Sequence, residues 1–383
     1  MSPSTYCKCQ LSDAIIKTMP TKLSILFASC FFLISSAGGR GNMKFHLTRS
    51  IPALDNNEAP SLLFKEELNR VLSEKRAGSF VLGKTQLGRN VEAYFFPGTS
   101  EKRALVISGM HGSELSSIEV ASELVRMLKQ TGTIYYNVII IPALFPDNAE
   151  TAKQFPLQIG DADNIGRYSF TGAVDPNRQM PTPGHAFDEE YELDHAGRKI
   201  ENENSLLLGL IGEYHPQRIV NLHAIREKNY AGVFADPRTD HKSMALGYAT
   251  DSSLAIEIAK HIHQHEGYVP GNHLSTIPNA LYYKDPEPAA AGEFQKRNFT
   301  GSFLPGKRGG GVSLGTWAST AVFDKFDSSK NRDAIRILTI EFPGSKRPVD
   351  YQLKKEQDYF QKLVEVYASG IYWVFLQEYF VEQ

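Results

Sequence analysis

The sequence predicts an α/β domain built on a mostly parallel sheet. Short apolar runs alternate with helical patterns of apolar residues along most of the chain, and this order is typical of parallel strands joined by helices. Polar side chains that can bind metal ions stand at the ends of three of these runs. The chain has 383 residues, with 42% hydrophobic and 22% charged residues, as in soluble globular proteins.

The N-terminal residues carry the pattern of a signal peptide, predicted to span residues 1–37. An apolar run from Leu23 to Ile34 follows two lysines and precedes small residues that end at Ala37, the expected cleavage site. Met19 is an alternative start that gives a more conventional signal, and an uncleaved anchor is the alternative to cleavage. The run is too short for a comfortable membrane span.

Residues 38–60 are predicted to form a linker and residues 61–383 the folded, catalytic domain. All the cysteines precede the expected cleavage site, at Cys7, Cys9 and Cys30. The mature chain would therefore contain no disulfide and no thiolate metal site. After cleavage we expect no stable membrane span.

The first half of this domain shows clear apolar periodicity. The predicted elements are a helix at 62–75, two strands at 78–97 around a turn at 83–88, a strand at 105–109, a helix at 116–128 and a strand at 138–142.

The second half is predicted to contain more irregular structure. Residues 147–181 and 183–198 are expected to be rich in loops, and 270–315 to form a long irregular segment of the kind that often carries function. The remaining elements are a helix at 204–214, a strand at 218–223, a helix at 252–266, a strand at 335–342 and helices from 351 onward.

The turn after the strand at 105–109 contains His111-Gly-Ser-Glu114. An imidazole and a carboxylate at this spacing can meet one metal ion, although the pair alone is weak evidence. A second strand ends in His223, and a third ends with Glu341 in an otherwise apolar run. Ligands bind at the carboxyl ends of parallel strands, so the sequence predicts a site at this edge.

The three expected metal ligands are His111, Glu114 and His223, around one zinc ion. A catalytic zinc site keeps a position open for water, and Glu341 is the candidate general base because a carboxylate in an apolar strand is costly unless it faces a cleft. Arg167 is the candidate stabiliser of an oxyanion. Asn177 and Arg178 are candidates for binding a substrate carboxylate.

Each of these residues also has an ordinary structural explanation. His111 could cap the following helix, Glu114 could favour its N-terminus, and Glu341 could pair with Arg336 or Lys346. The ordered set at strand ends favours the metal site over these explanations. The net charge of −2 argues against a general nucleic-acid binder.

As an ordered set, the motifs resemble those of the zinc carboxypeptidase family, the carboxypeptidase A-like group. The matching pieces are His111-Gly-Ser-Glu114, Asp175-Pro-Asn177-Arg178, Asn221-Leu-His223 and Thr339-Ile-Glu341. The resemblance implies a single domain around a mixed, about eight-stranded sheet, one zinc ion, and a peptidase. It implies that His111, Glu114 and His223 are the zinc ligands and that Glu341 is the base. It also implies that Asn177 and Arg178 bind the substrate carboxylate.

Within that family, Ser313-Leu-Gly-Thr-Trp317 resembles a segment of the bacterial murein-peptide amidases. That resemblance implies a short peptide substrate with a free carboxylate, such as a cell-wall peptide containing γ-D-glutamyl-diaminopimelate. A signal peptide would place such an enzyme outside the cytoplasm, secreted or periplasmic. The alternatives are a deacylase of the aspartoacylase and succinylglutamate desuccinylase type, and an inactive peptide-binding module.

Overall fold

The computed structural model describes residues 60–131, 133–168, 174–242, 244–274, 310–345 and 354–378. The chain divides into two units, Met1–Asp55 and Asn56–Gln383, and the second contains every described helix and strand. The predicted signal peptide and the linker up to residue 59 lie outside the described residues. None of the described helices is long and apolar enough to cross a bilayer.

Seven strands of the described chain form one mixed sheet in the order β1-β2-β4-β3-β5-β7-β6. The four inner strands β4, β3, β5 and β7 are parallel, whereas β1, β2 and β6 pair in antiparallel fashion toward the edges. The predicted α/β fold with a mixed, mostly parallel sheet is therefore confirmed. The strands are Gly78–Lys84, Asn90–Phe96, Arg103–Ile107, Asn137–Ile141, Arg218–Ile225, Gly232–Ala235 and Arg336–Pro343, for β1 to β7.

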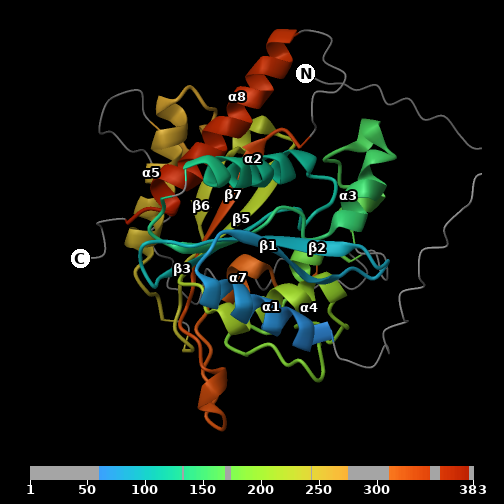
Figure 1. The fold of residues 1–383 in the computed structure, drawn as a ribbon. Helices are drawn as coiled ribbons and strands as arrows, with labels where there is room; N and C mark the ends of the chain where they lie inside the picture. Colours follow the sequence, from blue (N-terminus) through green and yellow to red (C-terminus); the bar gives the residue numbers. More distant parts are fainter. Residues whose placement is uncertain are drawn as a thin grey trace, which may run out of the picture. The chain divides into compact units, whose positions relative to one another are not determined.

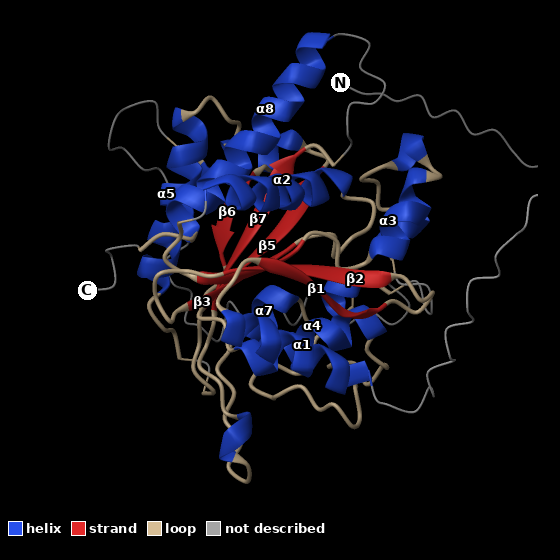
Figure 2. Ribbon diagram, in the orientation of Figure 1, coloured by secondary structure: helices blue, strands red, loops and turns tan. Residues whose placement is uncertain are grey.

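Helices cover both faces of the sheet (Figures 1 and 2). One face carries α1 (Pro60–Glu74), α4 (Asn202–Tyr214) and the short α7 (Leu314–Ala318), and the other carries α2 (Leu115–Thr131), α5 (Tyr248–Gln264) and α8 (Lys354–Gly370). Two apolar cores result, one on each face of the sheet.

The inner strands divide their side chains between these two cores. In β5, Val220, Leu222 and Ala224 pack on the side of α2, α5 and α8. Because successive side chains of a strand point to opposite faces, Asn221 and His223 lie on the side of α1, α4 and α7. The apolar alternation of β5 thus fixes the face on which His223 is presented.

Two predictions for irregular segments were incomplete, and the strand β6 lies where no element was predicted. Residues Pro146–Lys153, expected in a loop, form the helix α3, which begins with Pro146 at its first turn and Asp147 beside it. Its eight residues carry no long apolar stripe, so periodicity could not reveal it. The edge strand β6 has only four residues, too few for an alternating pattern. Within 270–315, residues 310–315 include the start of α7, while 275–309 lie outside the described residues.

Candidate metal centre and active site

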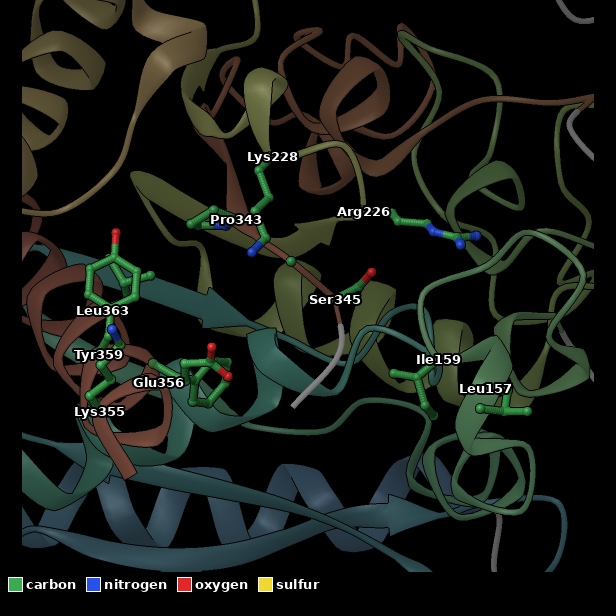
Figure 3. A pocket seen from close by; sticks show the side chains of 12 residues that line it. Leu157, Ile159, Arg226, Lys228, Pro343, Ser345, Lys355, Glu356, Tyr359 and Leu363 are labelled. Carbon is green, nitrogen blue, oxygen red and sulfur yellow. The ribbon is translucent and has the colours of Figure 1, made fainter. Parts of the chain in front are cut away.

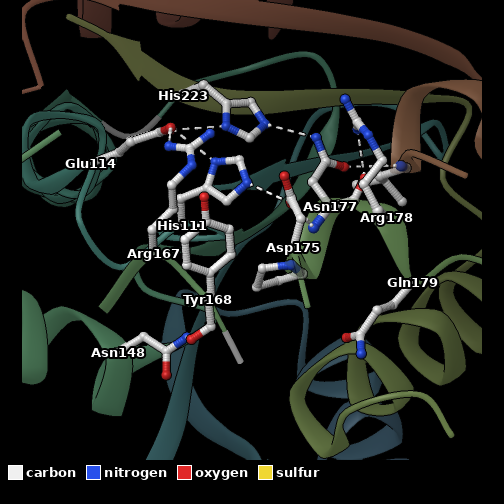
Figure 4. A network of polar contacts seen from close by, with 12 residues as sticks. His111, Glu114, Asn148, Arg167, Tyr168, Asp175, Asn177, Arg178, Gln179 and His223 are labelled. Atoms are coloured by element: carbon white, nitrogen blue, oxygen red, sulfur yellow. Dashed lines mark hydrogen bonds and ion pairs between the residues drawn. The ribbon is translucent and has the colours of Figure 1, made fainter. Parts of the chain in front are cut away.

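The residues predicted to form the site lie at or near the carboxyl ends of the parallel strands, and Figure 4 shows all of them except Glu341. His111 and Glu114 lie in the turn between β3 and α2, His223 lies in β5, and Glu341 lies in β7. His223 and Glu341 are register partners on neighbouring parallel strands. They therefore stand side by side on the same face of the sheet.

His111, Glu114 and His223 form a compact buried cluster. Their potential ligand atoms all lie within 4.8 Å of one another, and the three residues are only 3–4% exposed. The Glu114 carboxylate lies between the imidazoles, with Oε1 2.9 Å from His111 Nδ1 and Oε2 2.9 Å from His223 Nδ1. The backbone N–H of Ala224 also donates to Oε2, at 3.1 Å. Both imidazoles thus direct their Nδ1 atoms toward the carboxylate of Glu114.

This donor set fits a divalent transition-metal ion. Two imidazole nitrogens and one carboxylate are ligands that zinc takes in catalytic sites. Three ionisable side chains buried together are costly unless they share an opposite charge or an ion. The described residues contain this one group of three or more His, Cys, Asp or Glu side chains close enough to hold an ion.

The charges within the cluster balance one another. Burial opposes the charged forms, but the Glu114 and Asp175 carboxylates outweigh it and raise the pKa of His111 to about 9. Burial likewise opposes ionisation of Glu114, and the neighbouring His111 and His223 hold its pKa well below its usual value. A metal ion would replace the proton as the positive charge shared by these groups.

Asp175 contacts the side of His111 that faces away from Glu114, a role that the sequence did not reveal. Its Oδ1 lies 2.8 Å from His111 Nε2, the imidazole nitrogen that faces away from Glu114, and accepts from the backbone N–H of Asn177 at 2.8 Å. A metal-binding histidine usually donates its second N–H to a carboxylate, which fixes the tautomer and the ring orientation. The signal was present, because Asp175 belongs to the same turn as Asn177 and Arg178.

Replacing Asp175 by Ala is expected to weaken metal binding by about 10- to 100-fold, because His111 loses the partner that orients its ring. Competition with a chromophoric chelator would measure the affinity. Asp188→Ala, at an exposed loop position, is the matched control and should leave the affinity unchanged. An unaltered affinity in Asp175→Ala would show that the contact does not support the site.

Gly112 allows the turn that contains His111 and Glu114 to approach α3 closely. A Cβ atom at this position would lie 2.3 Å from the backbone carbon of Asn148, well inside van der Waals contact. Asn148 is itself held by donating from Nδ2 to the carbonyl of Tyr168 at 2.9 Å, next to Arg167. The helix that the sequence did not predict therefore joins the turn of His111 to the segment that carries Arg167.

Glu341 has the environment expected of a general base. Burial raises its pKa above the usual value, and the negative charge of Glu114 adds to this, whereas His223 and His111 act in the opposite direction. A carboxylate with a raised pKa accepts and returns a proton near neutral pH more readily. Its role as the base remains a prediction.

Arg167 points into the cluster, where its Nη1 donates to Glu114 Oε1 at 2.6 Å. It lies in a short 3-10 turn, Ile165–Arg167, whose preceding residue Asn164 accepts from the backbone N–H of Gly166. Burial opposes its charge, but Glu114 and Asp175 more than compensate and raise its pKa. Arg167 is thus a fixed cation beside the ligands, where the predicted oxyanion role requires one.

Asn177 and Arg178 lie on the opposite side of the cluster from Glu114 (Figure 4). Asn177 Oδ1 accepts from the backbone N–H of Leu314 at 3.0 Å, so its amide donor Nδ2 turns toward His223 Nε2, 3.5 Å away. Arg178 Nη1 donates to the carbonyl of Asn177 at 2.7 Å. The first turn of α7 therefore positions this pair beside the ligands.

Asp236, directly after β6, was missed because β6 itself was not predicted. Its Oδ2 accepts from Thr339 Oγ1 at 3.2 Å, and Thr339 stands two residues before Glu341 on the same face of β7. Desolvation raises the pKa of Asp236 to about 6, while Thr339, His223 and Arg178 lower it. Asp236 is thus a carboxylate beside the Asn177–Arg178 pair that is mostly ionised at neutral pH.

No protein-family model matches the chain, and the search of curated proteins found no match. Similar solved structures include a murein-tripeptide amidase from Escherichia coli O157, which is 16% identical, with 75% of this chain and 92% of that chain covered and a TM-score of 0.39. A metallo-carboxypeptidase from Burkholderia cenocepacia is 13% identical, with 81% and 68% covered and a TM-score of 0.38. A carboxypeptidase A from Helicoverpa armigera is 11% identical, with 80% and 74% covered and a TM-score of 0.43.

By name, these proteins come from the enzyme group that the ordered motifs resemble. Because every one of these TM-scores is below 0.5, the case for the function of this chain rests on its own residues.

Proposed function

We propose that the chain is a zinc-dependent peptidase that hydrolyses an amide bond in a short peptide with a free carboxylate. One observation carries this proposal: a buried His111–Glu114–His223 cluster stands beside Glu341 on the neighbouring strand. When bound there, a zinc ion would supply a water molecule that is acidic enough to be deprotonated at neutral pH.

Proton transfer, stabilisation of the transition state and substrate binding are assigned to residues of the chain. Glu341 takes the proton from the attacking water and returns it to the leaving amine. Arg167 offers fixed N–H donors to the oxygen that becomes negative in the transition state. Asn177 and Arg178 bind the carboxylate of the leaving residue and thereby align the scissile bond.

The position and charge of Asp236 favour a substrate whose leaving residue carries an amine on its side chain. Its carboxylate lies against Gly315 of α7, next to Leu314, which donates to Asn177, so a substrate held by the Asn177–Arg178 pair would bring its side chain toward Asp236. Diaminopimelate carries both an ammonium group and a carboxylate at the far end of its side chain. We therefore propose the bond between γ-D-glutamate and diaminopimelate in cell-wall peptides as the one cleaved, by a secreted or periplasmic enzyme.

The test is mass spectrometry of L-Ala-γ-D-Glu-meso-diaminopimelate incubated with the mature chain, with and without a zinc chelator. Release of diaminopimelate that the chelator stops is the expected result. An untouched peptide, with zinc bound, would exclude this substrate. A parallel panel of N-acyl amino acids would then reveal a deacylase, and zinc binding without turnover on any peptide would reveal a binding module.

Replacing Asp236 by Asn is expected to raise KM for the diaminopimelate peptide while changing little for a peptide that ends in norleucine. The carboxylate is ionised above its pKa of about 6, so the wild-type preference should be present above this pH and decline as the pH falls through it. Kinetics with the two peptides between roughly pH 5 and pH 7, about one unit on either side of this pKa, measure the preference. If Asp236→Asn kept the wild-type preference for the diaminopimelate peptide over the norleucine peptide, Asp236 would not take part in recognising the side chain.

A further inference from the structure

A cavity of about 630 Å³ opens beside the candidate active site, between α8 and the ends of β5 and β7 (Figure 3). Its wall includes an apolar part made by Leu157, Ile159, Pro343, Phe360 and Leu363. It also carries cations from Arg226, Lys228 and Lys355 against one acid, Glu356. A cavity of this size and composition suits an extended ligand with both apolar and anionic parts.

The cavity wall contains residues that closely follow two predicted site residues in the chain. Arg226 is three residues beyond His223, and Pro343, the last residue of β7, is two residues beyond Glu341. At about 3.3 Å per residue, the cavity starts within about 10 Å of the predicted ligands, the reach of two or three peptide residues. The backbone N–H of Gly160 also donates to the carbonyl of Ser113, next to Glu114, at 3.0 Å.

The cavity and the Asn177–Arg178 pair adjoin helices on opposite faces of the sheet. Asn177 contacts α7, whereas the cavity is lined by α8, and these helices cover opposite faces of the sheet. A peptide held at one end by Arg178, with its scissile bond at the cluster, would continue toward the cavity. The acyl half of the substrate is the part that reaches it.

The polar groups of the cavity wall include Lys228, Ser345 and Arg226. Lys228 folds over Gly344, where its Cε lies 3.4 Å from the position of a Cβ atom, and this brings its ammonium group to the rim beside Ser345. Ser345 Oγ is buried and has no hydrogen-bond partner among the described residues. Arg226 forms an ion pair with Asp161, which holds its guanidinium at the other side of Ser345.

Gly160 makes room for this hydroxyl. It has a positive φ of 77°, and a Cβ atom there would lie 1.7 Å from Ser345 Oγ. Ser345 Oγ has no hydrogen-bond partner among the described residues, so it would gain one from a carboxylate that reached it.

We propose that this cavity binds the acyl half of the substrate and that Lys228, with Ser345 and Arg226, selects a carboxylate carried by the residue on that side of the scissile bond. This inference rests on the proposed function and names the acyl-side substrate class. In a γ-linked D-glutamyl peptide, the free α-carboxylate of that residue supplies the anion.

The test compares two peptides that differ by one charge, L-Ala-γ-D-Glu-meso-diaminopimelate and its analogue with the glutamyl α-carboxylate converted to an amide. The wild-type chain is expected to favour the acid in kcat/KM by about fivefold, mainly through KM, as for a partly exposed ion pair. The preference should shrink at high salt. Lys228→Gln should bring the two peptides toward equal kcat/KM by lowering kcat/KM for the acid more than for the amide.

Two further variants distinguish an effect of the cavity on the preference from an effect of the overall charge of the protein. Ser345→Ala should lower the preference, and Lys260→Gln, on α5, should leave the preference as in the wild type. If the wild-type chain cleaves both peptides equally, the cavity does not read the carboxylate and the proposed function stands. If it cleaves neither, the proposed function fails and this inference fails with it.

Discussion

Replacing Glu341 by Gln is expected to lower turnover by about 10²- to 10⁴-fold while zinc binding stays at one ion per chain. The amide keeps the shape of the side chain but cannot take a proton from water. Glu341 is not one of the three clustered ligands, so the ion should remain. Steady-state kinetics together with metal analysis of the purified variant measure both quantities.

The fold should tolerate this substitution. Because Glu341 is a desolvated carboxylate in an apolar strand, its loss removes a charge that burial penalises, and the thermal midpoint should not fall. Glu257→Gln, on α5, is the control for the change of charge alone. A Glu341→Gln chain with zinc bound and normal turnover would contradict the assignment of the base.

Replacing His223 by Ala is expected to abolish stable zinc binding and, with it, turnover. The variant removes one of three protein ligands and leaves Glu114 Oε2 with the N–H of Ala224 as its remaining partner in the cluster. Three protein ligands are the usual complement of a catalytic zinc site, and two hold the ion poorly. Equilibrium dialysis against buffered zinc would measure the loss.

His263→Gln is the matched control, since this imidazole lies exposed on α5 and belongs to no cluster of potential ligands among the described residues. It should bind zinc as the wild type does. Full zinc occupancy in His223→Ala would place the ion elsewhere and remove the basis for the proposed mechanism.

The sequence was most informative where a residue sits in a strand. The apolar run of β5 predicts the strand that carries His223, and the same holds for Glu341 in β7. Parallel pairing then brings these residues together, because the carboxyl ends of neighbouring strands meet at one edge. This is why the ligands and the candidate base could be proposed before the structure.

The sequence was least informative where contacts depend on short or irregular segments. Asp236 follows a four-residue edge strand, and Asp175 acts through a tertiary contact with His111 that no local pattern encodes. The cavity beside the site is assembled from loops after β5 and β7 and one face of α8, which lie far apart in the chain. Periodicity predicts elements, but it does not predict which side chains converge between them.

Anomalous diffraction at the zinc absorption edge, from crystals of the zinc-loaded mature chain, tests the central claim most directly. The account predicts one strong peak, in contact with the Nδ1 atoms of His111 and His223 and with the carboxylate of Glu114, while His111 Nε2 stays on Asp175. A peak at any other place, or no peak at this cluster in a chain that retains zinc in solution, would contradict it.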